Sequence, residues 1–156
     1  MSVTIEPVPA PTREVEELLT ELDEILGAAY APEQRHALSI DRLFQPDIRF
    51  YLARLDGEAM GCGGVALFDG YAEVKRMYAR EPARGRGIGK ALLASLEAEA
   101  RNAGKSLLRL ETGIYQTAAI ALYERWGFRP RGPFGPYAEL PPNAIATTYS
   151  TKSRCR

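Results

Sequence analysis

The spacing of apolar residues changes twice within the first 44 residues of the chain. Apolar and polar residues alternate over residues 3–8 and run into a proline-rich stretch, which predicts a short first strand. Over residues 15–26 the apolar residues recur at helical spacing, so we expect a helix that Thr12 caps and Gly27 ends. A second helix is predicted for residues 32–44.

From residue 48 the pattern becomes the alternation that is typical of strands. Two alternating runs meet at Asp56-Gly57, a dipeptide that strongly favours a hairpin turn. A further run, residues 71–79, follows Asp69-Gly70. We therefore expect three successive antiparallel strands between residues 48 and 79.

The second half of the chain alternates between helical and strand patterns. We predict a helix over 86–103, a buried strand over 106–112, a helix over 117–126 and a last strand near 145–151. The helix between strands 71–79 and 106–112 is long enough to make those strands parallel neighbours. The order of elements predicts an α/β fold with a mixed, mostly antiparallel sheet.

Composition narrows the class of protein. The chain has 156 residues, 46% of them hydrophobic, so we expect residues 1–156 to form a single domain. Its 20 basic and 20 acidic residues balance, which argues against nucleic acid as a partner. Cys62 and Cys155 lack zinc-site or redox spacing, so we expect no metal and a reducing, cytoplasmic setting. The sequence contains no apolar run of 18 residues, so we expect no membrane-spanning helix, and we recognise no leader peptide.

A glycine-rich segment separates strand 71–79 from the helix that follows it. It reads Arg84-Gly85-Arg86-Gly87-Ile88-Gly89-Lys90. Backbone N–H groups at the start of a helix can converge on an anion, and the helix dipole adds partial positive charge there. A diphosphate is the ligand that such a segment suits, although a tight turn without a ligand would also use glycines.

The spacing of these glycines separates several classes of nucleotide site. Gly85, Gly87 and Gly89 form G-x-G-x-G, which differs from the dinucleotide and P-loop patterns. Arg84, Gly87 and Gly89 form R-x-x-G-x-G, which resembles the acetyl-CoA loop of the GNAT (GCN5-related N-acetyltransferase) superfamily. The resemblance extends over residues 73–128 and includes AAIALYERWGF near its end.

The resemblance implies a fold and a mode of cofactor binding. In GNAT proteins helices cover both faces of the sheet, and acetyl-CoA lies between the two parallel strands where they splay apart. Here the backbone of Met77, Tyr78 and Ala79 would contact its pantetheine arm, and the Met77 N–H would stabilise the thioester oxygen. Residues 84–90 would bind its diphosphate. Gln116 occupies a position where relatives often use an asparagine that contacts the cofactor.

Tyr123 matches the catalytic tyrosine of the family within A-x-x-L-Y-x-x-x-G-F. A thiol has a reference pKa of about 8.5 and a tyrosine of about 10, so a tyrosine can hydrogen-bond to a leaving thiolate and protonate it. The resemblance therefore implies that Tyr123 is the general acid.

An amine acceptor is mostly protonated at neutral pH and needs a base before it can attack. By resemblance Glu111, at the end of its strand, is one candidate, and Glu73 on the neighbouring strand is another. A water chain, or a purely structural ion pair at each carboxylate, remains an alternative. These expectations describe an acetyl-CoA-dependent N-acetyltransferase acting on an amine of a small molecule or peptide.

Two rival functions remain open from the sequence. One is a non-catalytic acyl-CoA sensor that keeps the loop, and the other is a nucleotide-phosphate binder with a different fold. The resemblance also allows a homodimer, because many members of the family are dimers.

Overall fold

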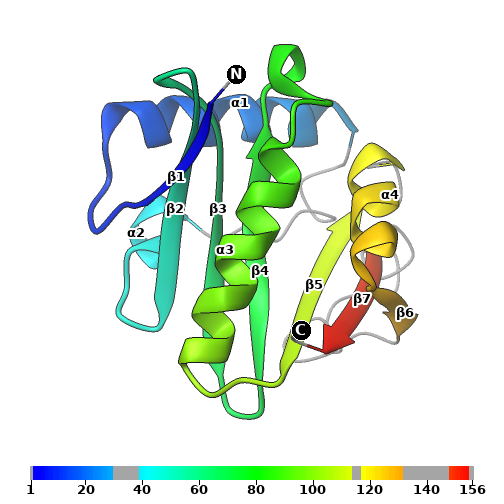
Figure 1. Ribbon diagram of the computed structural model, residues 1–156. Helices are drawn as coiled ribbons and strands as arrows, with labels where there is room; N and C mark the ends of the chain where they lie inside the picture. Colours follow the sequence, from blue (N-terminus) through cyan, green and yellow to red (C-terminus); the bar gives the residue numbers. More distant parts are fainter. Residues whose placement is uncertain (1, 30–38, 114–116, 132–147, 155–156) are drawn as a thin grey trace.

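The computed structural model describes residues 2–29, 39–113, 117–131 and 148–154. Within these residues seven strands form one sheet in the order β1-β2-β3-β4-β5-β7-β6 (Figure 1). The strands are β1 Val3–Pro7, β2 Ile48–Leu55, β3 Glu58–Phe68, β4 Tyr71–Ala79, β5 Leu107–Gly113, β6 Arg129–Arg131 and β7 Thr148–Arg154. All neighbours are antiparallel except β4 and β5, which are parallel as predicted.

Helices cover both faces of this sheet, so the predicted α/β architecture is confirmed (Figure 1). The helices are α1 Arg13–Ala29, α2 Ile40–Leu43, α3 Ile88–Asn102 and α4 Thr117–Trp126, with a short 3-10 turn, η2 Glu81–Ala83. On one face, α3 buries Leu93 and Leu96 in a core cluster that also holds Leu108 of β5. On the other face, α1 buries Leu18 in a cluster with Phe50 of β2.

The two predicted hairpins form at the predicted dipeptides. Asp56 and Gly57 have φ of 51° and 87°, the left-handed values that a two-residue turn of this kind needs at both positions. Gly70 has φ of 83° between β3 and β4. These turns bring β2, β3 and β4 together as the predicted meander.

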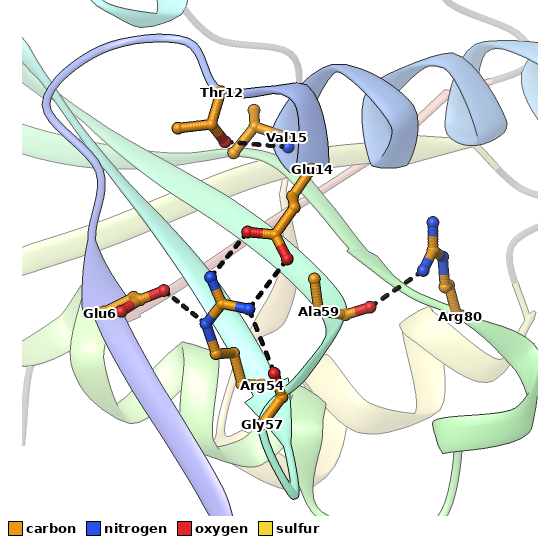
Figure 2. Close-up of polar contacts among 8 residues, drawn as sticks. All are labelled: Glu6, Thr12, Glu14, Val15, Arg54, Gly57, Ala59 and Arg80. Carbon is orange, nitrogen blue, oxygen red and sulfur yellow. Dashed lines mark hydrogen bonds and ion pairs between the residues drawn. The ribbon is translucent and has the colours of Figure 1, made fainter.

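Ion pairs hold α1 against the sheet. Thr12 accepts a hydrogen bond from the Val15 N–H at 3.2 Å, which confirms the predicted cap. Arg54 of β2 binds Glu6 of β1 and Glu14 of α1, with N–O distances of 2.7 Å in both pairs (Figure 2). These contacts fix the start of α1 against β1 and β2.

Further along α1, a second arginine makes similar contacts. Arg80, just after β4, pairs with Glu21 at 2.6 Å. It also donates to the Ala59 carbonyl at 3.0 Å (Figure 2). Tyr78 of β4 also donates its hydroxyl to Glu21, at 3.1 Å. The acidic face of α1 is therefore bound directly to β4.

Three boundaries differ from the predictions. The first helix continues past Gly27 to Ala29, because glycine is tolerated inside a helix at a modest energetic cost. Of the predicted second helix, residues 32–38 lie outside the described part, and α2 begins after Ser39, whose hydroxyl caps it. The last strand, β7, extends to Arg154 and pairs with a strand that was not predicted, β6.

Candidate active site

The parallel strands β4 and β5 pair only at one end. Their register contains two pairs, Ala72 with Leu108 and Glu73 with Arg109, although the strands have nine and seven residues. Beyond Glu73 the two ribbons diverge (Figure 1). From residue 74 to residue 79, the edge of β4 that faces β5 therefore makes no strand pairing within the described part of the chain. Such an edge presents backbone donors and acceptors that an extended ligand can use.

The residues assigned to the pantetheine arm lie on this diverging segment. Met77 packs its side chain beside α3, close to Gly63 and Gly89. Tyr78 points its ring to the opposite face, toward α1. The Ala79 carbonyl accepts a hydrogen bond from Arg84 Nε at 3.2 Å. The side chains of Met77 and Tyr78 are thus used in packing, and the Ala79 carbonyl already accepts from Arg84, so the other backbone groups of this segment are left for the role that the resemblance implies.

The glycine-rich turn lies directly beyond this edge and leads into α3. Gly85 and Gly87 have φ of 78° and 87°, and a Cβ built on either meets nothing within 4 Å. Glycine is therefore favoured at both positions by backbone conformation rather than by lack of space. Arg84, Arg86 and Lys90 are exposed around the turn.

Gly87 is the N-cap of α3, and the first helical bond runs from the Ala91 N–H to the Gly87 carbonyl at 3.0 Å. The amides of Ile88, Gly89 and Lys90 precede it, in the first turn, where a helix offers no acceptor of its own. These amides and the helix dipole favour an anion. Ile88 is only 1% exposed, and its side chain packs in the core beneath the turn.

Gly89 has a separate reason for being glycine. A Cβ at this position would lie 2.6 Å from Cδ2 of Leu122 on α4. The glycine therefore permits close packing of α3 against α4, the helix that carries Tyr123.

The two candidate bases lie on adjacent strands. Glu73 is 1% exposed and forms an ion pair with Lys75 at 2.8 Å. Burial, and after it the negative charge of Glu73, raise the pKa of the Glu111 carboxyl to about 8, while Lys75 opposes the shift. A carboxyl with a pKa near the working pH is suited to accepting a proton.

Tyr123 lies inside the core rather than on the surface. Its side chain is 6% exposed, and its ring meets Phe128 edge-on with centroids 5.8 Å apart. Burial raises the pKa of the hydroxyl to about 12. Tyr123 therefore stays protonated at neutral pH and can donate a hydrogen bond, although full proton transfer to a thiolate is less favourable than for an ordinary tyrosine.

Some of the predicted positions cannot be placed. Gln116 lies outside the described residues, as does His36, the single histidine of the sequence. The residues that the structure describes contain no group of three or more His, Cys, Asp and Glu that could hold a metal ion. No helix in the described ranges is long and apolar enough to cross a bilayer.

Sequence reasoning missed two basic residues next to the predicted site. Lys75 pairs with Glu73, and Arg76 lies at an irregularity in β4 with φ of 52°. The available signal was the adjacent basic pair Lys75-Arg76 inside a strand that also contains Glu73. That pattern alone does not indicate which face of the sheet the side chains occupy.

Residues 14–128 match the family described as the Acetyltransferase (GNAT) family. This chain is a GNAT protein. An IAA acetyltransferase from Azospirillum brasilense is 51% identical over 129 residues, which cover 81% of this chain and 84% of that protein. The family match over residues 14–128 includes both the glycine-rich turn and the two diverging strands, β4 and β5.

Solved structures of GNAT proteins agree with this assignment. A Klebsiella pneumoniae protein, provisionally described as an acyl-CoA N-acyltransferase, has a TM-score of 0.77 and 34% identity, covering 99% of this chain and 98% of that one. A GNAT family acetyltransferase from Elizabethkingia anophelis, with acetyl-CoA bound, has a TM-score of 0.67 and 27% identity, covering 97% of each chain. The chain is therefore an acyltransferase of the N-acetyltransferase class, as the sequence predicted.

Proposed function

We propose that this protein transfers the acetyl group of acetyl-CoA directly to a primary amine of a small molecule or peptide. One observation carries the proposal: among the residues that the structure describes, no strand pairs with the β4 edge that leads into the glycine-rich turn at the start of α3. A related GNAT structure with bound acetyl-CoA supports the choice of ligand. Cys62 and Cys155 support a reducing, cytoplasmic setting for one catalytic domain, residues 1–156.

The described residues fit acetyl-CoA along its length. Backbone groups of Met77, Tyr78 and Ala79 suit the amides of a pantetheine arm, because that arm can pair like a strand. The amides of residues 87–90 suit a diphosphate at the helix N-terminus. The charges of Arg84, Arg86 and Lys90 would add attraction to the phosphates.

Acetyl-CoA would supply an activated acetyl group and leave as the free thiol. Glu111 would accept the proton that the amine must lose, with Glu73 as the alternative base. The Met77 N–H would stabilise negative charge on the acetyl oxygen. The Tyr123 hydroxyl would donate its hydrogen to the departing sulfur. Each role belongs to a residue on β4, on β5 or on α4, which packs beside the turn.

Release of free thiol from acetyl-CoA in the presence of a panel of amines tests the proposal. We expect thiol release that depends on the acceptor, together with a rise in melting temperature on adding acetyl-CoA. Binding of acetyl-CoA without thiol release across the panel would instead favour the sensor function. Stabilisation by ATP or NAD, but not by acetyl-CoA, would favour a nucleotide binder and contradict the proposal.

A further inference from the structure

Arg76 occupies a strained position in β4. Its φ of 52° lies in the left-handed region, which non-glycine residues rarely adopt. In the register with β3, Gly64 opposes Lys75 and Cys62 opposes Tyr78, so Arg76 and Met77 both lie opposite Gly63. This is a β-bulge, a feature that redirects a side chain and is common beside active sites.

The side chain of Arg76 is buried and only partly satisfied. It is 6% exposed, and Nη2 donates to Asp23 of α1 at 2.7 Å. Nε and Nη1 are shielded from solvent and have no hydrogen-bond partner. Together these two nitrogens carry three N–H groups. Leaving such charged donors unsatisfied is energetically costly, so the site calls for an acceptor group that the described residues do not supply.

Two nearby arginines show that this is unusual within the same fold. Arg80 donates from Nε and Nη2 to Glu21 and from Nη1 to the Ala59 carbonyl. Arg54 likewise donates from all three of its nitrogens. The unsatisfied nitrogens of Arg76, at the bulge, are therefore not a general property of the arginines that contact α1.

The location of Arg76 links it to the proposed chemistry. It directly precedes Met77, whose N–H we assign to the acetyl oxygen. Because side chains alternate along a strand, Glu73 and Lys75 share one face of β4. Arg76, through its contact with Asp23, is directed to the face that α1 covers. Asp23 is 59% exposed, so water screens its charge and Arg76 keeps much of its attraction for an anion.

We propose that Arg76 binds an anionic group of the acceptor, so that the acceptor is a compact amine that also carries a carboxylate, phosphonate or phosphate. Guanidinium groups bind such oxyanions through parallel N–H bonds. The amine of the same molecule would then lie toward Glu111 and Glu73, which attract a cation. This inference rests on the proposed function, since it names the acceptor class of that site.

Matched acceptors test the proposal on the unaltered protein. Thiol release is measured with α-amino acids against their carboxamides, and with aminoalkyl phosphonates against their dimethyl esters. Rates are compared per concentration of unprotonated amine, because neutralising the anion lowers the pKa of the amine. We expect kcat/KM at least tenfold higher for the anionic member of the productive pairs.

The outcomes of this comparison separate the inference from the function beneath it. Equal or better turnover of the neutral members would overturn the inference and leave the acetyltransferase intact. A preference confined to phosphonates or to carboxylates would identify which anion the site takes. Absence of both thiol release and acetyl-CoA binding would overturn the proposed function, and the inference with it.

Two variants distinguish anion binding from a structural role. Arg76→Met should raise KM for the anionic acceptor at least tenfold, with KM for acetyl-CoA and for the neutral member unchanged. Asp23→Asn should lower KM for the anionic acceptor, because it removes the competing carboxylate. A purely structural pair predicts instead that both variants lose stability in parallel with unchanged selectivity. If Arg76→Met fails to fold, an Asp23→Asn enzyme with an unchanged or higher KM for the anionic acceptor would contradict the proposal.

Discussion

Replacing Glu111 with glutamine should remove the main rise of kcat/KM with pH. Burial, with the charge of Glu73, raises the pKa of this carboxyl from 4.5 to about 8. A group with this pKa is about 10% ionised at pH 7 and about 90% ionised at pH 9. If its ionised form is the base, kcat/KM should increase about tenfold over this range before the ionisation of the acceptor amine is counted.

The assay is thiol release at subsaturating acceptor from pH 6 to pH 10. Glu111→Gln should lower kcat/KM by about 100-fold at pH 9, within the range typical of general bases, and by about tenfold at pH 7. The variant should keep only the rise that belongs to the acceptor amine. An inflection near pH 8 that survives in the variant would refute the assignment of Glu111 as the base.

Glu73→Gln is the matched control for this experiment. Because the charge of Glu73 raises the pKa of Glu111, its removal should move the inflection below pH 8 while activity is retained. If Glu73→Gln loses activity and Glu111→Gln still shows the inflection of kcat/KM near pH 8, Glu73 rather than Glu111 is the base.

The same pKa predicts how stability depends on pH. A carboxyl whose pKa is higher in the folded than in the unfolded state binds a proton more tightly when the protein is folded. The contribution of Glu111 to the free energy of unfolding therefore falls as pH rises from about 4.5 to about 8. Glutamine cannot titrate. We therefore compare the melting temperatures of Glu111→Gln and of the unaltered protein. The variant's value minus that of the unaltered protein should grow between pH 5 and pH 8 and then level off. A difference that does not depend on pH would contradict the raised pKa.

Three further substitutions test the packing, the turn and the acid. Gly61→Ala should destabilise the protein by about 1–3 kcal/mol, because the added Cβ would lie 2.8 Å from the Tyr78 carbonyl oxygen. The control Gly63→Ala should destabilise it clearly less, because the added Cβ would have no contact closer than 3.4 Å. Equal urea midpoints for the two variants would refute this reasoning. Gly87→Ala and Gly57→Ala replace glycines of equal φ, 87°, so both should lower the melting temperature, but only Gly87→Ala should weaken acetyl-CoA binding in calorimetry. Tyr123→Phe should lower kcat by about tenfold or more with little change in acetyl-CoA affinity, and an unchanged kcat would exclude it as the acid.

Local chemistry made much of the fold predictable. The hairpins follow from Asp56-Gly57 and Asp69-Gly70, and the helix that carries Tyr123 was predicted with its observed bounds. The parallel pairing of β4 and β5 follows from the length of the crossover helix. By contrast, β6 and β7 are rich in polar and charged residues, so their strand character comes from pairing with β5 and with each other.

The site was predictable in its residue types but not in its environment. The register of β4 and β5 determines that Glu73 lies opposite Arg109 and acts on Glu111, and no local pattern encodes that register. The bulge that buries Arg76 depends on a shift in the pairing of β3 with β4. Gly89 was assigned to the phosphate turn, and the structure adds a packing reason in its closeness to Leu122.

A crystal structure with CoA tests the central claim most directly. We predict main-chain hydrogen bonds between the pantetheine arm and residues 77–79 of β4, where no strand pairs with that edge. The diphosphate should contact the amides of residues 87–90, and the sulfur should lie within hydrogen-bonding reach of the Tyr123 hydroxyl. A CoA molecule bound elsewhere, with protein filling the space between β4 and β5, would contradict the account.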